Sequence, residues 1–487
     1  MRRQLDPRSL RWPLISANPS GHPWTRVARA ARAVAASTVA ASSLAVSSLA
    51  VSSLTCPALA VAQTAPTAVP PTVAAAASVS AAAPVSAAAP VSANTAVEFQ
   101  PGERVVLLGG AFIERLQVHG HLESRLVATL GERQLVFRNL GWSGDTVWGE
   151  ARAVFGGPPD GFKRLVNDTV AAKPTMILLQ YGAAEAHAGP AGLGEFQAQL
   201  GRLLDTLAVT KARLVLLSPT RRERPTPSFP DPAAYNANLG IYCETLAKVA
   251  RERGLAYVDL QDLFDHADAN ANITFTDNGL HPHEVGYAVA SERIASRLNA
   301  AYRPWSVEIE GTAGKSTSGV AVKDVQRTGD AISFRATAAT LPSPPVFHNR
   351  QPAIFGTVTP AGKRYPMVEQ HSTLRVAGLA AGDYELRVDG QVAATATAAQ
   401  FAAGVRFENP ADMKQAESLR QAICEKNTLY FHRYRPQNET YLFLFRKHEQ
   451  GNNAVEIPQF DPLIAEKEAA IQTLRMPVER RFEIVKR

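Results

Sequence analysis

The sequence predicts an α/β protein whose parallel sheet is covered by helices on both faces, followed by a β-rich region and terminal helices. Short, nearly continuous apolar runs such as residues 104–108 alternate with longer helix-like segments, a pattern typical of buried parallel strands. After Trp305 the pattern changes to an alternation of apolar and polar residues between Gly turns. The chain is therefore expected to hold two differently built regions.

The elements of the α/β region follow one another in a regular order. Its apolar runs predict five strands, at residues 104–108, 134–138, 175–181, 212–217 and 255–259. The segments between and after them predict five helices, at residues 113–130, 162–172, 191–208, 231–253 and 284–300. We expect these strands to form one parallel sheet in the order 2-1-3-4-5.

The C-terminal part is expected to contain a small antiparallel β module at residues 304–410 and a helical region at residues 411–487. Strand-like alternation with Gly turns predicts the module. Apolar residues at helical spacing over 412–429 and 460–474 predict the helices. Cys243 and Cys424 could pair in an oxidising compartment, and their separation in sequence leaves that pairing open.

Residues 1–62 have the composition of a secretory signal peptide. They hold seven Arg and one Asp, and then a mildly apolar stretch that ends in Ala60-Val61-Ala62. A membrane anchor is the alternative, which the many Ser and Ala residues disfavour. Residues 63–97 repeat Ala-Ala-Ala-Pro-Val-Ser and predict a disordered linker, so an α/β domain at residues 98–303 should begin the folded part. We expect an exported protein, periplasmic or extracellular, with no stable membrane span after processing.

The charge of the chain argues against a nucleic-acid partner. The formal net charge is +7, and the arginines of residues 1–62 account for nearly all of it. The remainder is close to neutral, whereas a nucleic-acid-binding domain carries a clear basic excess.

Four segments place Gly and polar residues directly after predicted strands or before the last predicted helix. They are Gly109-Gly110-Ala111, Asn139 to Thr146, Gly182 to Glu185, and Thr276 to His283. In open α/β sheets the ligand lies beyond the carboxyl ends of the strands. We therefore expect these four segments to face one cleft.

The same four segments resemble, in order and spacing, the four sequence blocks of the SGNH (GDSL) hydrolases over about residues 98–300. These are serine esterases and acetylesterases with a flavodoxin-like three-layer α/β/α fold. The resemblance implies an ester ligand, either a small molecule or a glycan, and no cofactor. It also implies that Ala111 stands at the position of the serine nucleophile and Ala184 at that of the oxyanion-binding Asn.

The resemblance further implies that Gly141 donates its backbone N–H to the oxyanion and that His281 is the general base. Asn278 stands where the family has the Asp that orients this His, and Asp277 is the neighbouring carboxylate. Gly141 could instead serve only a tight turn. The remaining histidines show no metal-ligand spacing, so no metal site is predicted.

The leading hypothesis is an exported bacterial protein of esterase-like fold that has lost the Ser-His-Asp mechanism, a pseudoenzyme whose cleft binds an acylated ligand. Ala111 has no hydroxyl, which removes the group that His281 would deprotonate. One alternative is an active hydrolase with Ser143 as a relocated nucleophile, although Ser143 with Gly144 and Asp145 also fits a turn. Another is a structural or adhesion protein that uses the C-terminal module. Asp145 and Glu185 are further candidates for the cleft, and Glu185 could equally be a solvated residue at a helix start.

Overall fold

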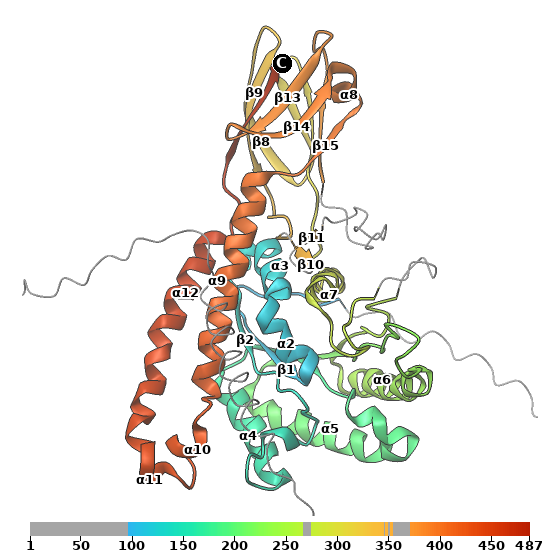
Figure 1. Cartoon of the computed structure of the whole chain (residues 1–487), viewed down its shortest axis with the longest axis vertical. Coiled ribbons are helices and arrows are strands. Elements are labelled where there is room, and N and C mark those ends of the chain that lie inside the picture. The colour runs from blue at the N-terminus through green and yellow to red at the C-terminus, as the bar shows by residue number, and fades with distance from the viewer. Residues whose placement is uncertain (1–95, 266–273, 345, 349–350, 354–370) are drawn as a thin grey trace, which may run out of the picture. The chain divides into compact units, whose positions relative to one another are not determined.

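The computed structural model describes residues 96–265, 274–344, 346–348, 351–353 and 371–487 (Figure 1). The predicted signal peptide and nearly all of the predicted linker lie outside the described residues. Among those that are described, no helix is both long and apolar enough to cross a bilayer.

A five-stranded parallel sheet forms the centre of the α/β domain, which confirms the predicted fold class. Its strands lie in the predicted order β2-β1-β3-β4-β5, and every neighbouring pair is parallel. The strands are β1 (Arg104–Gly109), β2 (Val136–Asn139), β3 (Met176–Gln180), β4 (Arg213–Leu217) and β5 (Ala256–Val258). Such strands end at one edge, where their loops can meet.

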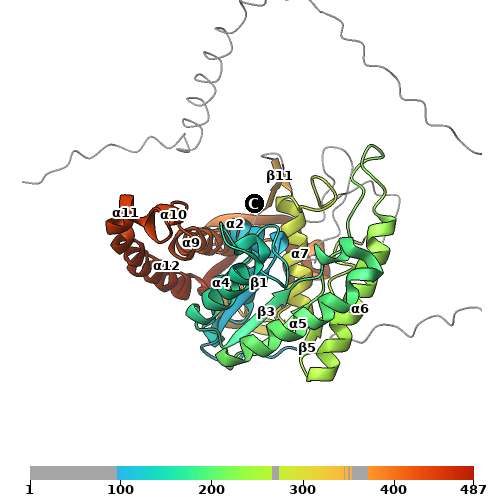
Figure 2. The same cartoon turned by 90° about the horizontal axis from the view of Figure 1, so that it is seen from below.

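Alternate side chains of the strands enter two separate hydrophobic cores. Val105 and Leu107 of β1 point to one core, and Val106 and Leu108 point to the other. The first core is covered by α2 (Ala111–His119), α3 (His121–Thr129) and α7 (Glu284–Arg297). The second is covered by α4 (Pro158–Ala171), α5 (Leu193–Leu207) and α6 (Ala233–Arg253). The domain therefore has the expected three layers, and Figure 2 shows strands β1 and β3 between α2 and α7 on one side and α5 and α6 on the other.

The single helix predicted at residues 113–130 is divided in two by Gly120. This residue has φ +67°, a conformation that ends α2 and that favours Gly. A Cβ at this position would lie only 2.8 Å from Sγ of Cys424. The break therefore also lets the C-terminal region approach closely. Short 3₁₀ segments complete this domain: η1 (Gly131–Arg133), η2 (Glu150–Arg152), η3 (Glu185–Gly192) and η4 (Ala208–Thr210).

The β-rich region contains two larger sheets, a four-stranded sheet in the order β15-β12-β6-β7 and a five-stranded sheet in the order β14-β13-β16-β9-β8. Their strands are β6 (Ser306–Glu310), β7 (Ala313–Ser318), β8 (Val320–Thr328), β9 (Ala331–Ala338), β12 (Ser372–Val376), β13 (Asp383–Val388), β14 (Gln391–Thr397), β15 (Val405–Phe407) and β16 (Arg480–Lys486). A small ribbon of β10 (Val346–His348) and β11 (Gln351–Ala353) and the short helix α8 (Ala398–Ala403) accompany them.

Two features of this region differ from the sequence-based expectation. Strands β6 and β12 pair in parallel, so the module is not wholly antiparallel. Strand β16 comes from the stretch expected to be helical, and it lies between β13 and β9 in the middle of its sheet. The ring of Phe482 on β16 stacks on Phe334 of β9 with centroids 4.9 Å apart, so the end of the chain belongs to the core of the module.

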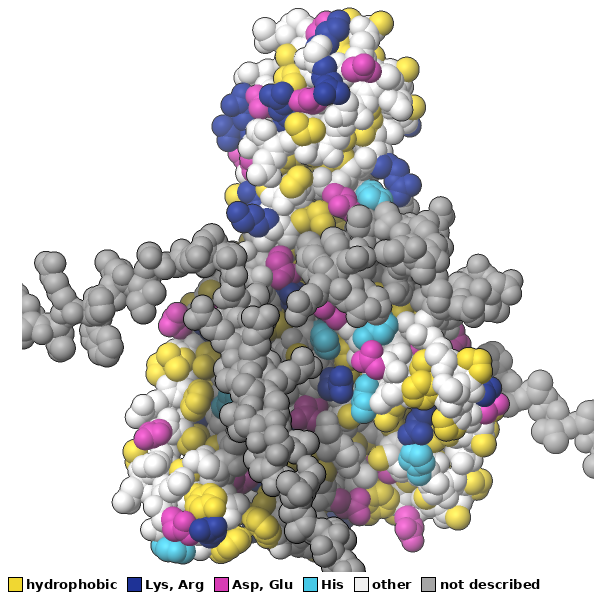
Figure 3. Space-filling model, viewed as in Figure 1, with side chains coloured by type: hydrophobic (Ala, Val, Ile, Leu, Met, Phe, Trp, Pro, Cys, Tyr) yellow, Lys and Arg dark blue, Asp and Glu magenta, His cyan; other side chains and the backbone are white. Residues whose placement is uncertain are grey.

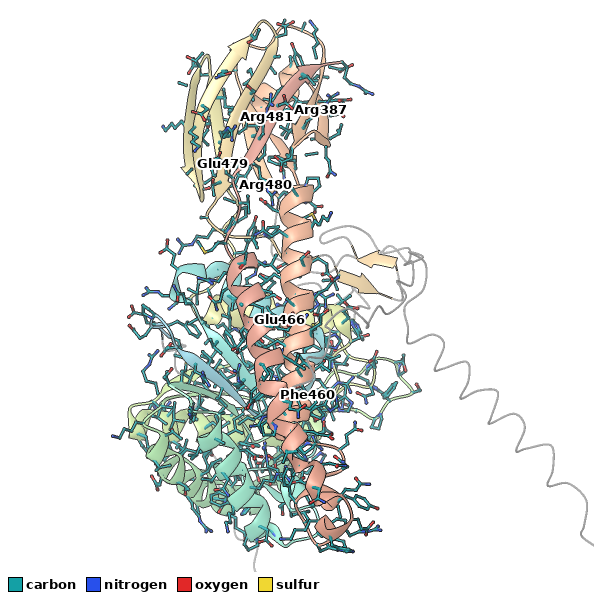
Figure 4. All side chains as sticks on the ribbon, turned by 90° about the vertical axis from the view of Figure 1, so that its left-hand side faces the viewer. Arg387, Phe460, Glu466, Glu479, Arg480 and Arg481 are labelled. Carbon is teal, nitrogen blue, oxygen red and sulfur yellow. The ribbon has the colours of Figure 1, made fainter. Side chains whose placement is uncertain are left out.

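The C-terminal helices are α9 (Pro410–Tyr434), α10 (Glu439–Leu442), α11 (Lys447–Gln450) and α12 (Phe460–Leu474), with η5 (Gly451–Gln459) before α12. Helices α9 and α12 run side by side (Figures 1 and 2). Figure 4 shows Phe460 and Glu466 on α12, and Arg480 where the chain passes into β16. Nε of Arg480 donates to Oδ1 of Asp412 in the first turn of α9, at 2.9 Å. This bond joins the start of α9 to the start of β16.

Helix α9 is also bound to the α/β domain by a buried ion pair. Nζ of Lys426 lies 2.6 Å from Oε1 of Glu123 on α3, and both side chains are at least nine-tenths buried. Cys424, two residues before Lys426 on α9, donates its thiol to the carbonyl of Val118. Cys424 and Cys243 are both free thiols, and Cys243 is buried in the other core, so the pairing considered from sequence is not formed.

Candidate functional site

A cavity of about 320 Å³ lies at the carboxyl edge of the parallel sheet, where the fold places ligands. It is formed by the loops after β1, β2, β3 and β4 and by the loop before α7. The residues that line it are 110–112, 143–145, 180, 181, 183–185, 187, 219, 220, 222, 235, 280 and 281. Ala111, Ser143, Ala184 and His281 therefore lie around one cavity, with Asp145 and Glu185 among its walls.

Ala111 is the first residue of α2, directly after the tight turn that ends β1. Gly109 is required in that turn, because a Cβ there would lie 2.4 Å from the carbonyl oxygen of Gln180. Gly110 is less constrained, since a Cβ there would meet only the carbonyl oxygen of Asp145 at 3.4 Å. The backbone thus delivers residue 111 to the cavity edge, and the side chain that it delivers is a methyl group.

The surroundings of His281 fix which of its ring nitrogens carries the proton. Oδ1 of Asn278 accepts from the backbone N–H of Leu280 at 3.1 Å and from that of His281 at 2.8 Å. These two donors set the orientation of the amide, so its Nδ2 faces Nδ1 of His281 at 3.1 Å. An amide nitrogen only donates, and Nδ1 must therefore accept. The proton of the neutral ring lies on Nε2.

The charge state of His281 agrees with this tautomer. Burial lowers the pKa of His281, and the positive charges of Arg115 and Arg222 lower it further, while Asp277 opposes the shift. In a Ser-His-Asp triad the proton lies on Nδ1, held by a carboxylate, and Nε2 accepts the proton of the nucleophile. Here the two nitrogens have exchanged roles, so His281 presents a donor to a ligand.

Gly141 lies outside the cavity lining, which differs from the expected oxyanion role. Its N–H donates to Oδ1 of Asn139 at 2.8 Å. A Cβ there would lie 2.2 Å from the backbone nitrogen of Glu114, so close packing against α2 explains why this residue is Gly. Gly144 lines the cavity instead, with φ +79°. The resemblance assigned the cavity-lining Gly of this segment to Gly141. In the sequence, the turn-like pair Ser143-Gly144 was the signal for the Gly that lines the cavity.

The two acidic residues of the cavity wall are both held by internal contacts. Oε1 and Oε2 of Glu185 accept from the backbone N–H groups of Val147 and Gly182, each at 2.9 Å. Oδ2 of Asp145 accepts from Nε of Arg152 at 2.7 Å and from the hydroxyl of Tyr181 at 2.8 Å. Burial raises the pKa of both carboxyls, and these contacts oppose the shift. Both residues thus brace the loops around the cavity.

Ser143 is exposed at the rim, and its backbone N–H donates to Oε2 of Glu114. It borders this cavity and a second one of about 470 Å³ between α2 and α9. Within the described part of the chain, no hydroxyl is hydrogen-bonded to the ring of His281. Ser143 and His281 therefore share a cavity without forming a nucleophile–base pair.

Arg222 and His187 were missed by sequence reasoning. Nη2 of Arg222 lies 2.7 Å from Nε2 of His187, and its guanidinium carbon lies 3.6 Å from the centre of the Tyr235 ring. Burial and Arg222 together lower the pKa of His187. The available signal was the apolar run 214–217 followed by Ser-Pro-Thr-Arg-Arg, a fifth loop that leaves the same edge of the sheet. Figure 3 shows His side chains beside Lys or Arg side chains on one face of this domain.

The end of α9 holds the loop that carries Ser143. The hydroxyl of Tyr434 donates to the carbonyl of Gly141 at 3.2 Å, and Nη1 of Arg435 lies 3.0 Å from Oε1 of Glu114. The guanidinium of Arg435 also lies 3.4 Å from the centre of the Trp142 ring. The aromatic and basic segment that follows residue 430 thus supports the cavity from the C-terminal region. In the described residues, no three His, Cys, Asp or Glu side chains form a group that could hold a metal ion.

The comparisons with known proteins agree with this fold. The GDSL-like Lipase/Acylhydrolase family model matches residues 115–289. No curated protein matches the chain. Among solved structures, a gut microbial diltiazem-metabolizing enzyme has a TM-score of 0.63 at 15% identity, over 81% of this chain and 100% of its own. That share is larger than the α/β domain, so the similarity in fold includes part of the C-terminal region.

Two smaller solved structures match with low TM-scores. A putative GDSL-like lipase from Parabacteroides merdae has a TM-score of 0.35 at 13% identity, over 42% of this chain and 100% of its own. An acetylxylan esterase from Geobacillus stearothermophilus has a TM-score of 0.33 at 18% identity, over 42% of this chain and 98% of its own. Residues 115–289, most of the α/β domain, therefore match the GDSL-like lipase/acylhydrolase family, and the chain shares its fold with the diltiazem-metabolizing enzyme.

Proposed function

We propose that this protein binds an acylated ligand in the cavity at the sheet edge and does not hydrolyse it by the Ser-His-Asp route. The observation that carries the proposal is the bond from Nδ2 of Asn278 to Nδ1 of His281. It leaves Nε2 protonated, and a protonated nitrogen cannot take a proton from a nucleophile. The methyl group of Ala111 supports the same conclusion, because it offers no nucleophile. A glycan that carries acyl groups is one ligand of this class.

The proposal also includes export to the periplasm or the extracellular space of a bacterium. The expected leader at residues 1–62 supports it, and this leader lies outside the described residues. Sequencing the N-terminus of the protein recovered from culture medium or periplasm should give a start near Gln63. Recovery of the intact leader in a membrane fraction would contradict the export proposal.

We expect the wild type to have negligible activity on short acyl esters such as 4-nitrophenyl acetate. The variant Ala111→Ser should restore little, because its hydroxyl would face a His281 that donates. Ala184 also lacks the amide donor of the family, and such a donor is worth about 3 kcal/mol of transition-state stabilisation. A fourfold variant should hydrolyse esters faster than any single variant, since these residues act as a unit. It combines Gly110→Asp, Ala111→Ser, Ala184→Asn and Asn278→Asp. Initial rates at equal enzyme concentration measure this.

A relocated nucleophile is the second candidate function, because Ser143 lines the same cavity as His281. Ser143→Ala is its direct test. Substantial wild-type turnover that disappears in Ser143→Ala would replace the binding function by catalysis through Ser143. Turnover that survives Ser143→Ala would point to another group in the protein.

A further inference from the structure

The cavity has one cation without an acidic partner. Arg222 forms no ion pair with any carboxylate among the described residues, and its Nε is buried without a hydrogen-bond partner. The acidic wall residues Asp145 and Glu185 are held by Arg152 and by backbone N–H groups, respectively. Burying a charged donor without an acceptor costs free energy. Arg222 is therefore suited to a ligand that supplies the acceptor.

The guanidinium of Arg222 is held in place before any ligand arrives. The backbone N–H of Arg222 donates to Oδ1 of Asn236 at 2.9 Å, and Nδ2 of Asn236 donates back to the carbonyl of Arg222 at 3.0 Å. The Tyr235 ring lies under the guanidinium, and the Tyr235 hydroxyl is fixed by the carbonyl of Ala183 at 2.7 Å. His187 occupies only Nη2. A guanidinium fixed in this way loses little freedom on binding, which favours affinity.

His281 supplies a second donor to the same cavity. Its Nδ1 is occupied by Asn278, so Nε2–H is the ring group left for a ligand. The charge of Arg222 is close enough to lower the pKa of His281, which agrees with both residues lining one cavity. Ala111, Phe112 and Leu280 add apolar surface. A volume of about 320 Å³ suits a small molecule with one polar end.

We infer that the cavity binds a small carboxylate, whose oxygens accept from the guanidinium of Arg222 and from Nε2–H of His281. A planar carboxylate fits the fork of a guanidinium, and charge-assisted bonds of this kind are stronger than neutral ones. This inference rests on the proposed function in taking the cavity to be a binding site, and it changes the ligand from an acylated compound to the free carboxylic acid, whose apolar part would lie against Phe112 and Leu280. The cavity would then retain what an active relative of this fold releases.

Benzoate and its neutral analogue benzamide test this inference by calorimetry on the full chain. Benzoate should bind at least about tenfold more tightly than benzamide, because only the carboxylate makes charge-assisted bonds. Arg222→Gln should weaken benzoate binding by at least about tenfold, and Arg222→Lys by less, since lysine keeps the charge without the fork. Arg221→Gln is the matched control. Arg221 is exposed and paired with the exposed Asp265, so its loss should leave benzoate affinity unchanged.

Three results would overturn the carboxylate site: equal binding of benzoate and benzamide, unchanged benzoate affinity in Arg222→Gln, or tighter binding of inorganic phosphate than of benzoate. If Arg222→Gln fails to fold, as judged by circular dichroism, the affinities of the wild type for benzoate, benzamide and phosphate test the carboxylate site by themselves. Ester turnover tests the proposed function separately. A wild type that hydrolyses esters yet binds benzoate through Arg222 contradicts only the binding function. A wild type with neither turnover nor benzoate binding contradicts only the carboxylate site.

Discussion

The orientation of one amide determines the chemistry of His281. Replacing Asn278 by Asp would place a carboxylate opposite Nδ1 and remove the donor that keeps this nitrogen unprotonated. We expect Asn278→Asp to move the ring proton from Nε2 to Nδ1 and to raise the pKa of His281, because a nearby negative charge favours imidazolium. Nitrogen shifts of the imidazole in a long-range ¹H–¹⁵N spectrum, followed with pH, report both changes.

Asp277 provides the control for this experiment at the residue scale. It raises the pKa of His281 from an exposed position without a bond to the ring. Asp277→Asn should therefore lower the pKa of His281 and leave the proton on Nε2. A wild-type spectrum with the proton on Nδ1 would refute the assigned amide orientation, and with it the main support for the binding function.

Helix α9 behaves as part of the α/β domain. Lys426→Met would leave Glu123 buried beside an apolar side chain, and removing one partner of a buried pair typically costs about 3 to 5 kcal/mol. Combining Lys426→Met with Glu123→Gln should recover most of that loss, since the unpaired charge is gone. Urea unfolding of the two single variants and the double variant measures the coupling. Lys467→Met is the control, because its partner Glu425 is exposed and such pairs contribute little.

The ion pair of Lys426 and Glu123 makes the stability of the α/β domain depend on the C-terminal region. Deleting residues 305–487 would remove Lys426 and would expose the face of the core that α9 and α12 cover. Such a deletion would destabilise the α/β domain as well as remove the β module. If Lys426→Met lowers the free energy of unfolding by less than about 1 kcal/mol, this view is contradicted. The deletion would then report on the β module alone.

Sequence patterns predicted the elements that rely on local, continuous signals. The buried strand runs such as residues 176–180 gave the sheet and its order, and α12 has the predicted bounds. Strand β16 was missed because a short alternating stretch does not show which distant strands it will join. Arg222 and the tautomer of His281 were missed for a related reason. Both depend on partners such as Asn236 and on the direction of an amide, which only the folded chain defines.

The stability of the whole molecule should fall as the pH decreases from 6.5. Burial, with Arg115 and Arg420, lowers the pKa of His119 to about 4. Below pH 6.5 the unfolded chain takes up this proton and the folded chain does not, so the free energy of unfolding decreases until the folded pKa is reached. His119 should account for about 2 kcal/mol of the loss between pH 7 and pH 5. Burial lowers the pKa of His121 as well, so His121 also contributes to the loss of stability as the pH falls.

His119→Gln separates this effect from the buried carboxyls. Asp145 and Glu185 have raised pKa values and so act in the opposite direction as the pH falls. The variant should lose less stability than the wild type between pH 7 and pH 5, measured by urea unfolding at both values. His448→Gln, at a highly exposed site, should follow the wild type. If the free energy of unfolding falls equally between pH 7 and pH 5 in the wild type and in His119→Gln, His119 is not responsible for the pH dependence.

The place of β16 has a consequence for the order in which the molecule can be built during synthesis. A ribosome releases residues 480–486 after every other strand of their sheet, yet this strand lies between β13 and β9. Until then the pairs β13–β14 and β8–β9 have no common neighbour and present open edges to other chains. Such late, long-range closure is slow and exposes nascent protein to aggregation. The five-stranded sheet of the β module can therefore be completed only after all strands of the α/β domain have emerged.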